Sequence, residues 1–342
     1  MTLTHTFEWI NPSSDPNDET FADAISRVTL EGTPVSADSA GPEDAGACDA
    51  VLVGEPYDGA VIGRRGAREG PRGIRQSLAG VKTHHFELGS AGDDGFIGDV
   101  GDVDLLTGGT TADVSDVQQR VESVATSVYG CASGATNGRD GDGTVAGPRP
   151  VFLGGDNSLT VANVAPLLET GDDVGVVSFD AHLDCREPID GGGPSSGTPY
   201  YQLHERGLDA FAVVGARHFE TSRTYAAYVR DRGGEIITAE DVQTTPLETI
   251  TERALEAMAD VDRIFVSLDV DVLDAAAAPG VSAPTPGGVT SARLYPLLRR
   301  IVADERVAGF EVVECAPPLD EGTRTVDAAA RAIAHVLARW SA

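Results

Sequence analysis

Short apolar runs recur along the chain and are separated by stretches with helical or turn character. Most of them are apolar almost throughout, a pattern typical of strands that are buried on both faces of a parallel sheet. They lie at 50–54, 96–100, 151–155, 174–179, 211–215, 235–238, 264–268 and 308–313. Alternation of such strands with helices favours an α/β fold, in which helices cover both faces of a doubly wound, mostly parallel sheet.

Local signals predict the helices between these runs. Gly70-Pro71 is a plausible helix start because proline is tolerated in the first turn. Ser158 can cap the helix that follows the run at 151–155. Further helices are predicted near 111–129, 219–232, 246–259 and 326–340.

Two stretches lack this alternation. Residues 1–48 are polar and rich in Asp, Ser, Pro and Gly, so we interpret them as an acidic segment in front of a single domain, 49–342. Residues 131–148 are rich in Gly and Asp and have no apolar periodicity. They predict a surface loop.

The charge of the chain is strongly negative: 54 acidic against 25 basic residues give a net charge of −29. This balance excludes a nucleic-acid partner, since phosphate binding needs a basic patch. Self-repulsion at such a charge destabilises a compact chain in dilute salt, and added salt screens it. We therefore hypothesise a halophilic protein.

The compartment follows from what the sequence does and does not contain. No apolar stretch approaches the roughly 18 residues that a membrane span needs, and the first residues lack the basic start and apolar core of a signal peptide. The cysteines, at positions 48, 131, 185 and 315, show no disulfide or zinc spacing. We expect a cytoplasmic protein with no membrane partner.

Two clusters of acidic residues follow apolar runs. Asp180, His182 and Asp184 follow one run at intervals of two, and Asp269 and Asp271 follow another. In extended chain this spacing points side chains one way, and open α/β sheets bind ligands at the carboxyl ends of their strands. Four carboxylates and an imidazole suit a pair of divalent cations such as Mn²⁺, whose charges balance those of the acids. The clusters predict a two-metal site.

Together with other pieces of the chain, these clusters resemble the ureohydrolase (arginase–agmatinase) family. The similar pieces cover roughly residues 50–340 in the family's order and are Gly66–Arg75, the Gly-Gly-Asp156 turn, Asp180–Asp184, Ser267–Asp271 and Glu311–Glu314. The resemblance implies a three-layer α/β/α fold, two Mn²⁺ per subunit, and hydrolysis of a C–N bond in a small guanidine or amidine. It also implies a homo-oligomer, a trimer or a hexamer.

Within the family, two features are most similar to formimidoylglutamases. One is Ala278–Pro284, and the other is Ser195–Pro199, in which Ser196 stands where arginases and agmatinases tend to have a histidine. This likeness implies that N-formimino-L-glutamate is hydrolysed to L-glutamate and formamide, a step of histidine degradation. The alternative is an agmatinase or guanidinobutyrase, which would release urea from a guanidine.

The chain departs from the family at Asn157, where the turn normally reads Gly-Gly-Asp-His and the histidine is a metal ligand. An amide oxygen suits Mn²⁺ but is a neutral, weaker ligand than imidazole. We expect Asn157 to bind the first metal, with either a weaker first ion or one fully occupied position as the result. The serine at 196 leaves the family's proton shuttle unassigned.

The resemblance also implies roles for further residues. A water activated by both ions would attack the formimino carbon, and Asp184 would relay a proton to the departing amine. Glu314 stands at the family's position for the carboxylate that pairs with the planar cation of the substrate. Arg186 and Arg217 follow strand ends and could bind the two carboxylates of glutamate, with Ser195 and Ser196 as further substrate-binding candidates.

Two readings from other classes remain open. A deacetylase of similar architecture holds one zinc by Asp, His and Asp, and the added Asp184 and Asp271 argue against it. A binding protein that lost its activity with its first metal ligand is the second. Metal content and turnover at high salt distinguish both from a two-metal hydrolase.

Overall fold

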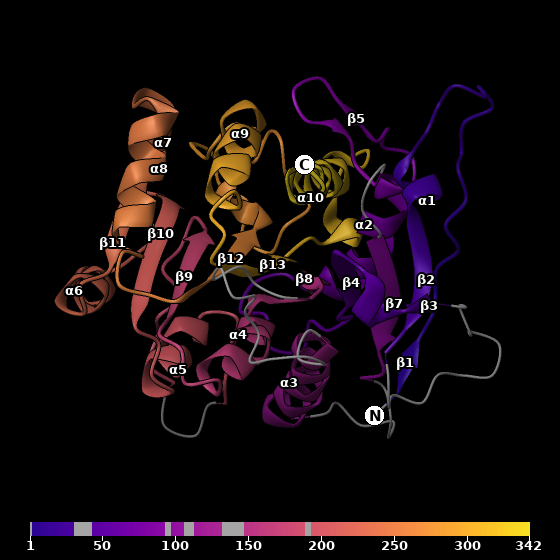
Figure 1. The fold of residues 1–342 in the computed structure, drawn as a ribbon. Coiled ribbons are helices and arrows are strands. Elements are labelled where there is room, and N and C mark those ends of the chain that lie inside the picture. The colour runs from indigo at the N-terminus through magenta and orange to yellow at the C-terminus, as the bar shows by residue number, and fades with distance from the viewer. Residues whose placement is uncertain (1, 31–42, 93–96, 106–112, 132–146, 189–192) are drawn as a thin grey trace.

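A central sheet divides the molecule into three layers (Figure 1). The structure is a computed structural model that describes residues 2–30, 43–92, 97–105, 113–131, 147–188 and 193–342. Its main strands are β4 (Ala50–Gly54), β7 (Ile97–Val103), β8 (Arg149–Leu153), β9 (Val174–Phe179), β10 (Ala210–Ala216), β11 (Glu235–Thr238), β12 (Arg263–Asp269) and β13 (Val307–Val313). All of the runs that the sequence predicted as strands are therefore strands.

The order of the strands places the ends of four of them side by side. Along the sheet they run β11-β10-β9-β12-β13-β8-β4-β7, and every neighbouring pair is parallel. In β12, Leu268 pairs with Phe179 of β9, so the two acidic clusters start at the same level of the sheet. The carboxyl ends of β9, β12, β13 and β8 consequently meet at one edge.

Helices cover both faces of the sheet, as the sequence predicted. One layer holds α2 (Gly70–Leu78), α7 (Ala239–Thr244), α8 (Leu247–Glu256), α9 (Ser291–Ile301) and α10 (Arg324–Trp340). The other holds α3 (Val114–Cys131), α4 (Thr160–Leu168), α5 (Pro199–Glu205) and α6 (Arg223–Asp231). The three-layer α/β/α class is confirmed.

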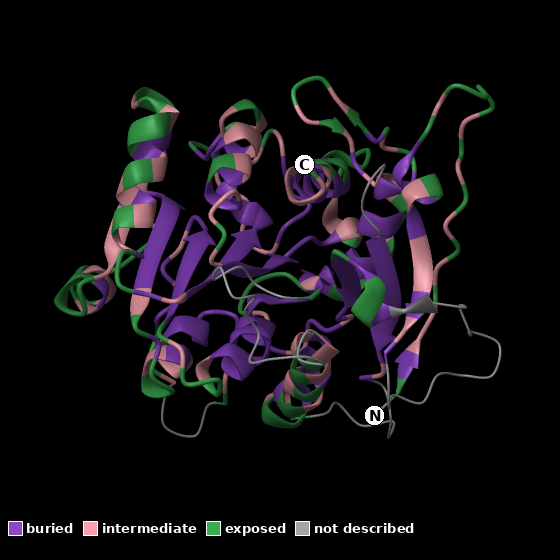
Figure 2. Ribbon diagram, in the orientation of Figure 1, coloured by how far each residue is buried: buried purple, intermediate pink, exposed green. Residues whose placement is uncertain are grey.

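Successive residues of a strand feed two separate cores. In β12, Ile264 and Val266 pack into the core under α8–α10, whereas Phe265 packs into the core under α3–α5. A strand with apolar neighbours on both faces must be apolar at every position. This is why the runs do not alternate, and why β4, β7, β9, β12 and β13 are buried along their length in Figure 2.

The N-terminal residues extend the sheet beyond β7. They form β1 (Leu3–Thr4), α1 (Phe21–Ala24), β2 (Ile25–Thr29) and β3 (Glu43–Asp44). β2 pairs parallel with β7, and β1 pairs antiparallel with it. The sequence predicted no strand in this segment, and the division into residues 1–48 and 49–342 stays a prediction. A small hairpin, β5 (His84–His85) with β6 (Gly89–Ser90), completes the strands of the described residues.

Several local predictions need correction. α3 and α6 begin a few residues later than predicted, α8 begins close to its predicted start, and α10 begins slightly earlier. α5, α7 and α9 were not predicted. Ser158 is not a helix cap: Asp156 caps a 3₁₀ turn at Asn157–Leu159, and its side chain accepts from the Ser158 N–H. The Asp156 carboxylate, two residues earlier, accepts from both the N–H and the hydroxyl of Ser158. α2 does begin at Gly70-Pro71.

The predicted loop at 131–148 lies mostly outside the described residues, since 132–146 are not described. Among the helices that the structure describes, none combines the length and apolar character of a membrane span.

Candidate metal centre

The predicted ligands come together at the carboxyl edge of the central strands. They form two overlapping groups that share Asp180: the first adds His182 and Asp271, and the second adds Asp184 and Asp269. Within each group, the ligand atoms lie within 4.8 Å of one another. Two groups with one shared carboxylate have the composition of a site for two neighbouring cations.

Turns after the strands, and not extended chain, aim these side chains. Asp180 accepts the His182 N–H at 2.6 Å, and Asp269 accepts the Asp271 N–H at 2.8 Å, which closes a tight turn after each strand. The Ala181 N–H donates to Asp271 at 3.3 Å and so ties the two turns together. The residues that alternation singled out do lie together, but not because of alternation, since β9 ends at Phe179.

Without cations, the ionised form of most carboxyl groups in this cluster is disfavoured. Burial, together with the neighbouring carboxylates, raises the pKa of Asp180 and that of Asp269 well above the usual value. Burial also raises the pKa of Asp184 to about 6. Asp180 Oδ2 is buried and has no hydrogen-bond partner. An orphaned buried oxygen among crowded carboxylates fits a bound divalent cation.

His182 lies between two carboxylates. Its Nδ1 is 3.1 Å from Asp271 Oδ2 and 3.5 Å from Asp180 Oδ1. Burial lowers the pKa of His182, but hydrogen bonds to these two acids outweigh it and raise the pKa to about 12. A bound cation would take the place of this proton, because a histidine that binds a metal is neutral.

Asn157 lies in the same cluster. Its amide nitrogen donates to Asp184 Oδ2 at 2.7 Å, and its backbone N–H donates to Glu314 Oε1 at 3.0 Å. The side chain is buried, with 1% exposed. The Asn157 amide therefore lies beside the ligand group of Asp180, Asp184 and Asp269, where it could bind the same cation.

Two carboxylates of the site have backbone in the left-handed region. Asp184 has φ 36° and Glu314 has φ 62°. Such conformations cost about 1–3 kcal/mol each in non-glycine residues and persist where the surroundings over-determine them. Glu314 is also buried, and its Oε2 has no partner. Glu314 therefore lies inside the site and not at the surface.

The substrate-binding candidates lie in different surroundings. Ser196 is buried, and its hydroxyl accepts from the Ile62 N–H at 3.1 Å, whereas Ser195 is half-buried. Arg186 is exposed, next to Gly197. Arg217 is buried and donates to the backbone carbonyls of 271, 273 and 285, so only its Nε lacks a partner. These contacts favour a structural role for Arg217.

Sequence reasoning assigned no role to four residues that support the cluster. Glu220 Oε2 lies 3.7 Å from His182 Nε2. Asp156 accepts from the Ala60 N–H at 2.8 Å, which ties the loop after β4 to the turn after β8. Glu311 lies in the middle of β13 and Thr160 begins α4; both are fully buried. A glutamate inside an apolar strand is rare enough to have been a signal.

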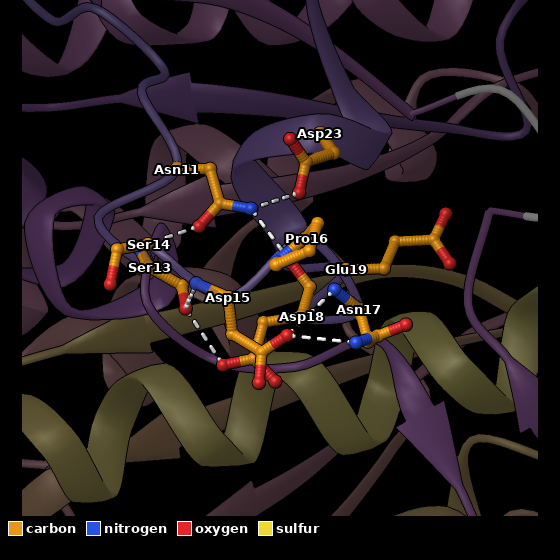
Figure 3. A pocket seen from close by; sticks show the side chains of 9 residues that line it. All are labelled: Asn11, Ser13, Ser14, Asp15, Pro16, Asn17, Asp18, Glu19 and Asp23. Atoms are coloured by element: carbon orange, nitrogen blue, oxygen red, sulfur yellow. Dashed lines mark hydrogen bonds between the residues drawn. The ribbon is translucent and has the colours of Figure 1, made fainter.

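A polar hollow lies away from this cluster, between residues 11 and 23 (Figure 3). Its side chains bond to each other: Asn11 donates to Asp23 at 2.6 Å, and Ser13 donates to Asp18 at 2.7 Å. Lys82 pairs with Asp18. These contacts within the loop satisfy its polar side chains, so the hollow gives no sign of a ligand site.

Comparisons with known proteins agree with this geometry. A family model for the arginase family matches residues 48–338. The chain is 52% identical over 333 residues to formimidoylglutamase of Halobacterium salinarum, covering 97% of each chain. It is 32% identical to a guanidinopropionase of Pseudomonas aeruginosa, covering 82% of this chain and 83% of that protein.

Solved structures give the same result. The crystal structure of formimidoylglutamase from Bacillus subtilis has a TM-score of 0.79 and 27% identity, covering 96% of this chain and 93% of that one. An asparagine-to-histidine variant of Trypanosoma cruzi formiminoglutamase with Mn²⁺ has a TM-score of 0.75 and 26% identity, covering 88% and 95%.

Proposed function

The chain belongs to the arginase family, and we propose that it hydrolyses N-formimino-L-glutamate to L-glutamate and formamide. The observation that carries this proposal is the pair of ligand groups that share Asp180 at the sheet edge. The identity of 52% to a formimidoylglutamase supports the substrate within the family. One water adds to the formimino carbon, and the bond from that carbon to the glutamate nitrogen breaks. The products are formamide and L-glutamate.

The ligand set fits two Mn²⁺. Asp180, His182 and Asp271 would hold one ion, and Asp180, Asp184 and Asp269 with Asn157 would hold the other. When bound, such ions supply a water of lowered pKa at neutral pH. Oxygen-rich ligands with one imidazole favour Mn²⁺ over softer metals.

The acids of the site move the proton and orient the substrate. We assign to the Asp184 carboxylate the transfer of a proton to the leaving nitrogen, which departs as an amine only after protonation. Glu314 Oε2, buried and unpartnered, can accept an N–H of the formimino group. A charge-assisted bond of this kind fixes the amidine plane.

The two carboxylates of the substrate need a cation or N–H donors at the rim. Arg186 is exposed, close to the loop that carries Ser195 and Ser196, so these residues are the proposed contacts. The guanidinium of Arg217 already donates to backbone carbonyls. We place it in support of the Asp271 turn.

Product analysis tests the proposal. The protein is incubated with Mn²⁺ in molar KCl, separately with N-formimino-L-glutamate, agmatine, guanidinobutyrate and arginine. Glutamate and formamide from the first compound alone are expected. Urea from any guanidine would keep the chemistry and overturn the substrate, whereas no product with two ions bound would indicate a binding protein.

Setting and assembly are further parts of the proposal. The net charge of −29 and the likeness to a Halobacterium protein support a cytoplasmic enzyme of histidine degradation that works in concentrated salt. A homo-oligomer, a trimer or a hexamer, is proposed from the family resemblance. Phe219, in the loop after β10, is fully exposed, which supports an interface there. Mass in solution by light scattering at molar salt tests the assembly.

A further inference from the structure

A buried chain of polar side chains leads away from Asn157. Its amide oxygen lies 2.6 Å from Thr160 Oγ1, and the same hydroxyl lies 2.7 Å from Glu311 Oε1. Thr160 and Glu311 are fully buried. The chain thus links the amide of the site to a carboxylate inside strand β13.

The hydroxyl of Thr160 cannot satisfy both contacts. It has one proton and faces two acceptor oxygens, those of Asn157 and Glu311. Two arrangements resolve this. Either Glu311 holds a proton and donates to Thr160, which donates to Asn157; or the amide of Asn157 turns over, its nitrogen donates to Thr160, and Thr160 donates to an ionised Glu311.

The second arrangement suits a bound cation. Turning the amide by a half rotation places its oxygen beside Asp184 Oδ2, where its nitrogen now donates at 2.7 Å. Two acceptor oxygens at that distance repel each other unless a cation lies between them. The nitrogen then needs an acceptor on the other side, and the Thr160 oxygen is already in place.

We propose that Thr160, oriented by Glu311, is a positioning residue that points the carbonyl oxygen of Asn157 at the metal. It gives an asparagine the fixed orientation that a ligand histidine obtains from the partner of its second nitrogen. The inference rests on the proposed two-metal function. It concerns only the ion that Asp180, Asp184 and Asp269 would hold together with Asn157, which we call the first ion.

Asn163 fixes which oxygen of Glu311 faces Thr160. Its amide nitrogen donates to Glu311 Oε2 at 2.8 Å and to Glu55 Oε2 at 3.1 Å, so its own amide is held by two acceptors. Glu311 therefore presents an acceptor to Asn163 and leaves its other oxygen for Thr160. A glutamine at 311 would have to put its oxygen toward Asn163 and its NH₂ toward Thr160.

Glu311→Gln consequently reverses the chain. The new NH₂ donates to Thr160, whose hydroxyl must then donate to the Asn157 oxygen, and the amide nitrogen of Asn157 is left facing the cation. Thr160→Val removes the hydroxyl at nearly constant shape, and Thr160→Ser keeps it. Expected affinities for the first Mn²⁺ fall about 10–100-fold in Glu311→Gln and Thr160→Val. They stay near wild type in Thr160→Ser.

Calorimetric titration of the metal-free protein with Mn²⁺ in molar KCl measures these affinities, and circular dichroism checks that each metal-free variant is folded. Asn157→Ala is the background for a double-mutant cycle. In that background Thr160→Val should have no further effect on Mn²⁺ affinity. A merely structural threonine would lower the melting temperature equally in both backgrounds.

The outcomes separate this inference from the proposed function. Two ions bound equally well by wild type and Thr160→Val would overturn the positioning role and leave the function intact. Two ions bound without hydrolysis of the formimino substrate would overturn the function and leave the positioning role intact. A wild type that binds one ion and still hydrolyses the formimino substrate would overturn the positioning role and keep the reaction.

Discussion

The buried ion triad around Arg75 gives a sharp test of how the frame is stabilised. Arg75 is fully buried in α2 and donates to Asp99 through Nε and Nη2, both at 2.9 Å, and to Asp102 through Nη1 at 2.5 Å. Trp9 and Thr6 donate to the same two acids at 2.9 and 2.5 Å. The triad therefore joins α2, β7 and the N-terminal residues.

Arg75→Met should cost about 3–5 kcal/mol, because removing one partner leaves uncompensated charge in the interior. The free energy of unfolding is measured by urea denaturation at fixed molar KCl. Arg300→Met is the matched control: Arg300 pairs with Glu248 at 2.6 Å, and both side chains are largely exposed. Loss of that pair should leave the stability nearly unchanged.

The dependence on pH carries the stricter test. Burial raises the pKa of Asp99, but the Arg75 cation and its hydrogen bonds outweigh burial and lower the pKa below the usual value. The wild type therefore keeps this stability at neutral pH and loses it as the pH falls through the lowered pKa. In Arg75→Met burial alone remains and raises the pKa, so acid relieves the variant.

The difference between variant and wild type should thus shrink as the pH falls from about 7 to about 5. A loss of unfolding free energy below about 1 kcal/mol would refute the conclusion that the charged triad stabilises the fold. So would a difference between variant and wild type that grows on acidification.

Three further predictions concern the site and its setting. A Cβ at Gly155 would lie 1.8 Å from the Tyr57 carbonyl oxygen, so Gly155→Ala should destabilise the protein by about 1–3 kcal/mol or more by overpacking, measured by urea denaturation. Arg186→Ala should raise KM for the formimino substrate with kcat unchanged, whereas Arg217→Ala should lower the melting temperature, since the Asp271 carbonyl loses its donor. The melting temperature should rise from dilute to molar KCl as the charge of −29 is screened, and a fall would sink the halophilic hypothesis.

The sequence predicted most of the sheet because burial on both faces leaves a mark in each strand separately. The runs at 174–179 and 264–268 are apolar whatever their neighbours are. β2 escaped prediction because Ile25–Thr29 is partly exposed and half polar, and it becomes a strand only by pairing with β7, far along the chain.

The supporting residues of the site escaped for a related reason. Thr160 and Glu311 are 151 positions apart, and neither has a neighbour in sequence that indicates the other. Glu220 reaches His182 only because β10 lies beside β9. Pairing of strands can be expected in general terms from the fold class, but the register that decides such contacts comes from packing of the whole sheet.

The predicted ligands lie together for a different reason from the one that the sequence argument gave. A period of two would aim Asp180 and Asp184 the same way only if the strand continued past Phe179, where it ends. Instead, a tight turn places Asp180, and Asp184 returns to the site through a left-handed residue with φ 36°. Side chains of an extended strand would lie in a row along one face of the sheet. The turns gather them around a common centre, which is what two adjacent cations require.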